Sequence, residues 1–306
     1  MTHLVIVGPT ASGKTELSLA IAQACGDVEI VSMDSMQVYR GLDIGTAKAT
    51  AAERAAIRHH LIDVVDASEE WSVARFQIAA RAAVRDIESR QKRALLVGGT
   101  GLYVQAVVDD LQIPGEDLAI RAALLAATSE PGGVARAYGQ LQVADPVAAA
   151  RIEPHNTRRI VRALEVIHST GRQFSSFGPG VAAFGPTAFP IHMVGIWLPR
   201  VLMTERIERR FERMRDTGLL AEVEALRSEG VWSRTAQQAI GYKEVLAYLD
   251  GVVPSVDEAF DLARRRTRAL ARRQRMWFRR DRRICWIGSS GNSSEVAAAI
   301  LASWSR

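Results

Sequence analysis

The sequence GPTASGKT at residues 8–15 matches the phosphate-binding pattern G-x-x-x-x-G-K-[ST] at every fixed position. The apolar run at residues 4–7 before it predicts a buried parallel strand, and the helical pattern after it ends near Gly26. In a strand, glycine loop and helix of this order, several backbone N–H groups and the positive end of the helix dipole point at one place. The segment therefore predicts a site for a phosphate or a diphosphate.

We expect every residue of this loop to contribute to that site: Gly8, Pro9, Thr10, Ala11, Ser12, Gly13, Lys14 and Thr15. Lys14 would balance the charge of the terminal phosphate. Thr15 would offer its hydroxyl to Mg²⁺ and is the one metal ligand that the sequence predicts.

Strand-like and helical segments alternate along most of the chain. Apolar runs predict further strands at residues 29–32, 61–65, 94–97, 194–198 and 284–287. Helical periods separate most of them, for example at residues 73–90 and 202–215. This alternation is typical of an α/β fold with a parallel sheet.

The strand signal lapses between residues 114 and 189, where helical periods occur instead at residues 118–127 and 158–169. We therefore predict a P-loop NTPase-like parallel sheet core at residues 1–113 and 190–306. Residues 114–189 would form an inserted, mostly helical subdomain.

The charge of the chain is concentrated in one segment. Its 306 residues carry a net charge of +5, but residues 264–283 contain eleven arginines and one aspartate, so this segment carries +10 and the remainder −5. On the helix predicted at residues 256–281, arginines 264, 268, 272, 275 and 279 share a face, and Ala263, Leu270 and Trp277 form an apolar stripe opposite. The asymmetry favours a polyanionic partner; the alternative is a solvated helix face.

Composition excludes several classes of protein. Apolar residues make up 48% and charged residues 24%, which excludes a disordered or collagen-like chain. The longest apolar runs are far shorter than a bilayer span, and no basic leader precedes the first strand, so we expect a cytoplasmic protein without a membrane partner. The two cysteines, Cys25 and Cys285, allow neither a disulfide framework nor a four-cysteine zinc site.

P-loop hydrolases usually carry an acidic residue at the end of a second strand, where it holds Mg²⁺ or orients water. Here the strand at residues 94–97 ends in Gly98-Gly99-Thr100-Gly101, without a carboxylate. This favours an enzyme in which the phosphate group of the substrate leaves, rather than one that hydrolyses ATP. Asp34 follows the strand at residues 29–32, so it should converge with Thr100 and the loop at one edge of the sheet; the alternative is that it caps a turn.

The chain resembles the bacterial tRNA dimethylallyltransferases, also called tRNA isopentenyltransferases, nearly from end to end. The motifs that carry the resemblance are GPTASGKT at 8–15, DSMQVYRGLDIGTAK at 34–48, HHLID at 59–63, GGTGLY at 98–103, NTRRIVRALE at 156–165, GLLAEV at 218–223, IGYKE at 240–244 and RRQRMWFRRD at 272–281. The family transfers a dimethylallyl group from its diphosphate to N6 of the adenine 3′-adjacent to the anticodon and releases diphosphate. The resemblance thus implies three partners, namely dimethylallyl diphosphate, Mg²⁺ and the anticodon stem-loop of tRNA, and a monomer without the zinc finger of eukaryotic relatives.

The resemblance also assigns roles to residues. Asp34 matches the proposed general base, Thr100 matches a residue near the reacting centre, and Arg210 is our choice for a clamp on the leaving diphosphate. Contacts with tRNA, to which the inserted subdomain would contribute, are implied for three segments: Asp34, Ser35, Met36 and Gln37; Arg158, Arg159, Ile160, Val161 and Arg162; and Gln238, Ala239, Ile240, Gly241, Tyr242 and Lys243.

Two other functions compete with this interpretation. The first 25 residues alone would suit a P-loop kinase of a nucleoside or small metabolite. A noncatalytic RNA-binding protein that holds a nucleotide as a structural ligand is the second alternative. The DSMQVYRG segment at residues 34–41 and the arginine-rich helix favour the transferase over the kinase, and Asp34 with Lys14 and Thr15 argues against a noncatalytic protein.

Overall fold

The computed structural model describes residues 1–230, 232–289 and 292–304. The chain divides into two compact units, of which the first comprises Met1–Asp109 and the chain from Pro186 onward, and the second comprises Asp110–Gly185. Both boundaries fall four residues before those expected from the sequence. The Ala188 N–H donates a 2.8 Å hydrogen bond to the Val108 carbonyl, so the returning chain rejoins the first unit before Pro190.

The first unit is built on a six-stranded sheet in the order β3-β2-β4-β1-β5-β6, in which every pair of neighbouring strands is parallel. The strands are β1 His3–Val7, β2 Val28–Ser32, β3 His59–His60, β4 Arg93–Gly98, β5 Ile191–Trp197 and β6 Cys285–Gly288. Because all strands run the same way, their carboxyl ends meet at one edge of the sheet. The predicted α/β core is thus confirmed.

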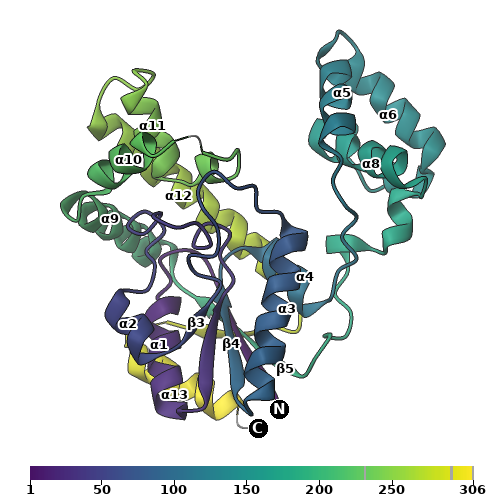
Figure 1. Ribbon diagram of the computed structural model, residues 1–306. Coiled ribbons are helices and arrows are strands. Elements are labelled where there is room, and N and C mark those ends of the chain that lie inside the picture. The colour runs from purple at the N-terminus through teal and green to yellow at the C-terminus, as the bar shows by residue number, and fades with distance from the viewer. Residues whose placement is uncertain (231, 290–291, 305–306) are drawn as a thin grey trace. The chain divides into compact units, whose positions relative to one another are not determined.

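Side chains that alternate along each strand pack on opposite faces of the sheet. Leu4 and Ile6 of β1 face α1 (Lys14–Cys25) and α13 (Ser293–Trp304). Val5 and Val7 belong to the larger core on the other face, which α3 (Val73–Ser89) and α4 (Gly101–Val108) cover (Figure 1). Burial on both faces explains why β1 reads as an unbroken apolar run.

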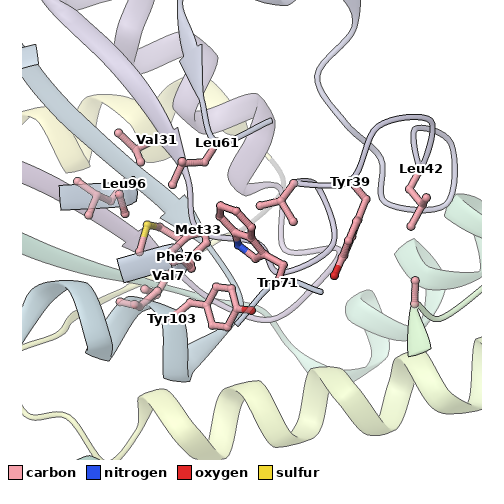
Figure 2. Close-up of a cluster of buried hydrophobic side chains, with 14 of the residues drawn as sticks. Val7, Val31, Met33, Tyr39, Leu42, Leu61, Trp71, Phe76, Leu96 and Tyr103 are labelled. Atoms are coloured by element: carbon pink, nitrogen blue, oxygen red, sulfur yellow. The ribbon is translucent and has the colours of Figure 1, made fainter. Parts of the chain in front are cut away.

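The remaining helices of the first unit are α2 Ala51–Ala56, α9 Arg200–Asp216, α10 Leu219–Ser228, α11 Tyr242–Leu249 and α12 Val256–Phe278. Figure 2 shows the core that lies beyond the carboxyl ends of the strands, where Met33 and Trp71 pack beside Phe76 and Tyr103. The rings of Phe76 and Tyr103 lie 4.3 Å apart between their centres. The chain that leaves β2 is therefore anchored to α3 and α4 by apolar side chains.

The prediction of a strand at residues 61–65 is wrong. The strand in this region is the shorter β3, and residues 61–65 form only an isolated bridge between Val65 and Tyr39. Leu61 and Asp63 have φ values of 63° and 57°, which an extended strand does not accommodate. Asp63 instead turns its carboxylate toward Lys48 and Arg54, so polar contacts prevail over the β propensity of the apolar residues.

The second unit consists of helices and 3₁₀ turns, and its described residues contain no strand. Its helices are α5 Leu118–Ser129, α6 Gly133–Ala144, α7 Pro146–Ala149 and α8 Thr157–Thr170. The buried Glu165 of α8 accepts hydrogen bonds from Arg121 and Arg162, which ties α5 to α8. In neither unit is any helix of the described chain long and apolar enough to cross a membrane.

Candidate active site

The glycine loop between β1 and α1 forms the floor of the candidate site. Gly13 has φ 89°, a left-handed conformation that glycine adopts without steric cost, and α1 begins at the next residue. The Lys14 ammonium donates to the carbonyls of Gly8 at 3.0 Å and Pro9 at 2.7 Å. Burial lowers the pKa of Lys14 to about 8, although the nearby Asp34 carboxylate favours its charged form.

Arg210 of α9 lies against the same loop. Its Nη1 donates to the Thr10 hydroxyl at 3.0 Å, and its Nη2 donates to the Gly45 carbonyl at 3.2 Å. Burial lowers the pKa of this guanidinium, and Asp34 again opposes that shift. Two cations, Lys14 and Arg210, therefore share the space beside the loop with a single carboxylate.

Asp34 and Thr100 come from the ends of β2 and β4, which are neighbours in the sheet. The Ser35 N–H donates to the Thr100 hydroxyl at 3.3 Å, and the Met36 N–H donates to Asp34 Oδ1 at 2.8 Å. Among the residues that the structure describes, Asp34 Oδ2 has no hydrogen-bond partner. One oxygen of Asp34 is thus fixed by the turn, and the other is not engaged by a described residue.

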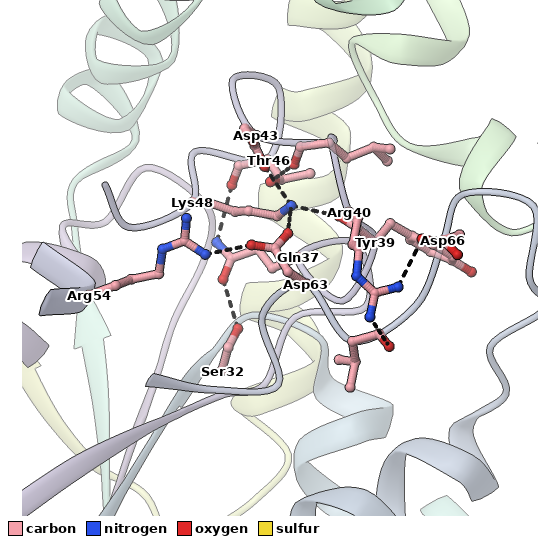
Figure 3. Close-up of polar contacts among 12 residues, drawn as sticks. Ser32, Gln37, Tyr39, Arg40, Asp43, Thr46, Lys48, Arg54, Asp63 and Asp66 are labelled. Atoms are coloured by element: carbon pink, nitrogen blue, oxygen red, sulfur yellow. Dashed lines mark hydrogen bonds and ion pairs between the residues drawn. The ribbon is translucent and has the colours of Figure 1, made fainter. Parts of the chain in front are cut away.

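A polar network holds the loop that follows Asp34 (Figure 3). The Ser32 hydroxyl donates to Gln37 Oε1 at 2.7 Å, and Gln37 Nε2 donates to the Thr46 carbonyl. The Lys48 side chain, only 3% exposed, donates to the Tyr39 carbonyl and to the carboxylates of Asp43 and Asp63, each at 2.6 Å. Gln37, which the resemblance implies as a tRNA contact, is therefore a member of the network that shapes the loop.

Tyr242 supports this loop from α11. Its ring is fully buried, and its hydroxyl accepts a 3.0 Å hydrogen bond from the Gly45 N–H and donates to Glu222 of α10. Burial, reinforced by Glu222, raises the pKa of Tyr242. The Glu222 carboxylate also accepts from the Ile44 N–H.

The segment at residues 238–243, implied as a tRNA contact, divides into exposed and buried parts. Gln238 is exposed, Ile240 and Lys243 are half-buried, and the Lys243 ammonium donates to Gln238 Oε1. Ala239, Gly241 and Tyr242 are buried. The buried residues are placed to support the segment from inside the protein, and the side chains of the others reach the surface, where a ligand could contact them.

The residues expected at 158–162 lie on α8 of the second unit. Arg158 and Arg159 are exposed, whereas Ile160 and Val161 are buried, and Ile160 belongs to the apolar core of this unit. Arg162 donates to the Pro114 carbonyl and to Glu165, so it holds the start of the insertion. Of these five side chains, Arg158 and Arg159 are thus the ones free to meet a polyanion.

The arginine-rich helix α12 differs in detail from the expected two-faced pattern. Its buried side chains are Ala259, Phe260, Ala263, Thr267, Ala271 and Phe278, and Leu270 and Trp277 are only partly buried. Arg264 and Arg268 form ion pairs with Glu208 of α9. Arg272 and Arg279 are exposed and form no ion pair within the described part of the chain. Helix α12 therefore has an exposed cationic face that includes Arg272 and Arg279, whereas Arg264 is part of the contact with α9.

The sequence assigns no role in the site to Gln274 or Glu222 and places Trp277 only in the apolar stripe of its helix, yet all three contact the site. Gln274 accepts a hydrogen bond from the Thr10 N–H across 264 positions of sequence, and Trp277 packs on Gly101. Gln274 and Trp277 lie in the motif RRQRMWFRRD and Glu222 lies in GLLAEV, so the family motifs are the signal that could have found them. No local pattern reveals contacts of this range.

A parallel sheet and a glycine loop that opens a helix define an α/β protein with a P-loop NTPase-like core, and Lys14 and Arg210 lie beside that loop. The family model described as IPP transferase matches residues 37–281. The chain is 48% identical over 302 residues to the tRNA dimethylallyltransferase of Salinispora arenicola (strain CNS-205), covering 98% of this chain and 86% of the relative. It is 45% identical over 302 residues to that of Corynebacterium glutamicum (strain ATCC 13032), covering 98% and 99%.

Solved structures of enzymes from the same family are similar to this chain. The full-length tRNA isopentenylpyrophosphate transferase of Bacillus halodurans matches with a TM-score of 0.71 and 39% identity, over 99% of this chain and 97% of that one. A eukaryotic dimethylallyltransferase described as acting on tRNA matches with a TM-score of 0.80 and 27% identity, over 98% and 77%. The chain belongs to the IPP transferase family, and it is an enzyme that transfers a prenyl group to tRNA.

Proposed function

We propose that the donor is dimethylallyl diphosphate and the acceptor is N6 of the adenine on the 3′ side of the anticodon. The observation that carries this proposal is the meeting of Asp34 and Thr100, from two different strands, with the phosphate loop and with Lys14 and Arg210. A carboxylate beside two cations suits a reaction in which an amine loses a proton while an anion departs.

In this reaction the adenine N6 forms a bond to C1 of the dimethylallyl group as the bond between C1 and the diphosphate oxygen breaks. The electron pair of the broken bond leaves with the diphosphate, and N6 gives up one proton. Because the amine is a weak nucleophile and the allylic carbon ionises readily, catalysis rests chiefly on stabilising the leaving anion. The enzyme must therefore supply positive charge to one ligand and a base to the other.

The positive charge would come from Lys14, Arg210 and the amino end of α1. The Lys14 ammonium would exchange the carbonyls of Gly8 and Pro9 for phosphate oxygens. Arg210 is already oriented by Thr10 and Gly45, so its remaining N–H groups would meet the diphosphate without reorganisation.

Asp34 would take the proton from N6. The Met36 N–H holds one of its oxygens, and the other would accept the proton, a role that general bases perform with about 10²- to 10⁴-fold acceleration. The Thr100 oxygen accepts from the Ser35 N–H, which directs the hydroxyl hydrogen away from Ser35 and toward a ligand oxygen.

Mg²⁺ fits the loop as a metal carried mainly by the diphosphate. The described residues contain no group of three or more His, Cys, Asp or Glu side chains placed to hold a metal, but Thr15 is exposed at the first turn of α1. Mg²⁺ commonly takes substrate phosphates and water with few protein ligands. Thr15 would supply the protein ligand, and the metal would neutralise diphosphate charge.

The tRNA would be recognised as an anticodon stem-loop. The adenine has to leave its stack to reach Asp34, and the exposed arginines of α12 suit the phosphates of an RNA. In the second unit, Arg158 and Arg159 of α8 would offer further cations to the tRNA. A metabolite kinase would have no use for the arginine-rich helix α12. If γ-phosphate from ATP reached a nucleoside while no prenyl group reached tRNA, the kinase would be the correct alternative.

The function is tested with Asp34→Asn, which keeps the size of the side chain and an acceptor for the Met36 N–H. We expect the single-turnover rate of prenyl transfer to fall by at least about 10²-fold, while tRNA affinity changes less than about threefold. Asp66→Asn is the matched control, because it makes the same exchange at a 65% exposed carboxylate that pairs with Arg40, and it should leave both quantities unchanged. Equal losses of rate and of tRNA affinity in Asp34→Asn would show that Asp34 binds tRNA and is not the base.

A further inference from the structure

Thr10 of the phosphate loop is held from two directions. Its backbone N–H donates a 2.8 Å hydrogen bond to Gln274 Oε1 of α12. Its hydroxyl accepts a 3.0 Å hydrogen bond from Arg210 of α9. A glutamine on the arginine-rich helix therefore fixes the same residue that orients the proposed diphosphate clamp.

The close packing of α12 extends to the turn that carries Thr100. A Cβ atom on Gly99 would lie 2.4 Å from Gln274 Nε2, and one on Gly101 would lie 2.3 Å from Cδ1 of the Trp277 ring. A side chain at Gly99 would displace the end of the Gln274 side chain, and one at Gly101 would displace the Trp277 ring, so α12 packs directly on both neighbours of Thr100. Gln274 thus touches the phosphate loop with one atom of its amide and the Thr100 turn with the other.

The two sides of α12 are separable by substitution. At about 100° per residue, the positions two residues before and after Gln274 lie on the opposite side of the helix. Met276 occupies one of them and is 64% exposed. A change at Met276 therefore alters the same turn of α12 without touching the loop.

We propose that Gln274 is a positioning residue of the donor site, which fixes the Thr10 peptide so that Thr10 and Arg210 meet the diphosphate in one geometry. The inference rests on the proposed function, since the loop is taken to bind the diphosphate of the donor. Without the acceptor at position 274, the Thr10 N–H loses its partner and the peptide is free to rotate. The Thr10 hydroxyl then no longer holds Arg210 in a single orientation.

The test uses Gln274→Met in the full-length protein, because methionine has nearly the volume of glutamine and lacks the carbonyl acceptor. The affinity for inorganic pyrophosphate with Mg²⁺, measured by titration calorimetry, should fall about tenfold, the loss expected for one buried hydrogen bond. The KM for dimethylallyl diphosphate should rise by a similar factor, while kcat changes less than about threefold and tRNA affinity is unchanged. Met276→Gln, the reverse exchange on the outer side, should leave pyrophosphate affinity at the wild-type value.

A residue with only a structural role would weaken pyrophosphate and tRNA binding alike, so parallel losses in Gln274→Met would overturn the proposal, as would unchanged pyrophosphate affinity. Amide exchange of Thr10 in the wild-type protein, followed by NMR after ¹⁵N-threonine labelling, provides a measurement that needs no variant. The hydrogen bond to Gln274 predicts a protected Thr10 amide, and exchange at the rate of a free amide would contradict it. If the wild-type protein binds pyrophosphate but transfers no prenyl group, the proposed function fails while the role of Gln274 stands.

Discussion

Removing Arg272 and Arg279 together should reduce the salt dependence of tRNA binding. Both side chains are exposed on α12, and neither forms an ion pair within the residues that the structure describes. Each cation that meets a phosphate steepens the fall of log affinity with log salt by about 0.7 to 0.9. The double variant R272Q/R279Q should therefore flatten the slope by about 1.4 to 1.8.

The expected difference is large enough to measure by filter binding. Between about 50 and 200 mM salt, the wild-type protein should lose about 7- to 12-fold more affinity than the double variant. R264Q/R268Q removes the same charge from the same helix, but both of these arginines pair with Glu208. This control should change the slope by less than one. If both double variants had the same slope of log affinity against log salt, only the total charge of the helix would matter. If R272Q/R279Q had the wild-type slope, this side of α12 would be a solvated face that does not contact tRNA.

Two further predictions concern Lys14 and Lys48. Because burial lowers the pKa of Lys14 to about 8, its positive charge is present well below that pH, is half lost at that pH and is lost as the pH rises further. The contribution of Lys14 to the affinity for dimethylallyl diphosphate should therefore be constant well below pH 8, and the affinity should fall by up to tenfold per pH unit above pH 8. Lys14→Met should bind this donor weakly at every pH. A wild-type affinity that stays constant up to pH 10 would contradict the prediction. Lys48→Met should lower the free energy of unfolding, measured in urea, by about 2 kcal/mol, because the buried Tyr39 carbonyl and the Asp63 carboxylate lose their hydrogen bonds to the ammonium. The lost ion pair with the more exposed Asp43 should add little to this cost. Lys92→Met, which removes a 41% exposed partner of Glu29, should cost less than about 1 kcal/mol, and equal costs for the two variants would refute the importance of the Lys48 network.

The parts of the fold that short-range patterns encode were predicted from the sequence. The strand before the glycine loop, the loop itself and the helix after it span fewer than 25 residues, and their periodicity and glycines specify them locally. The strand prediction for residues 61–65 fails because the apolar residues there have β propensity, whereas Leu61 and Asp63 adopt positive φ values. The Asp63 carboxylate is engaged by Lys48 and Arg54, contacts that the apolar pattern does not reveal. Propensity is a weak signal where such tertiary contacts compete with it.

The candidate site shows the same division. Asp34, Thr100 and the loop could be brought together by the rule that parallel strands end at one edge. The side chains that support the site could not be predicted, because they contact it from far along the chain. Gln274 lies 264 residues from Thr10, and Tyr242 lies 197 residues from Gly45. Tyr242 was expected as a tRNA contact, but its ring is buried and its hydroxyl is engaged, which a motif alone does not distinguish from a surface aromatic residue.

The most direct test of the proposed reaction is transfer of label from dimethylallyl diphosphate to two versions of one tRNA. The first has adenine on the 3′ side of the anticodon, and the second differs only by guanine at that position. With Mg²⁺ and the wild-type protein, label should enter the first tRNA at that adenine and release one diphosphate per prenyl group, and the second should stay unlabelled. Equal labelling of both tRNAs, or diphosphate release without labelling of either, would contradict the account.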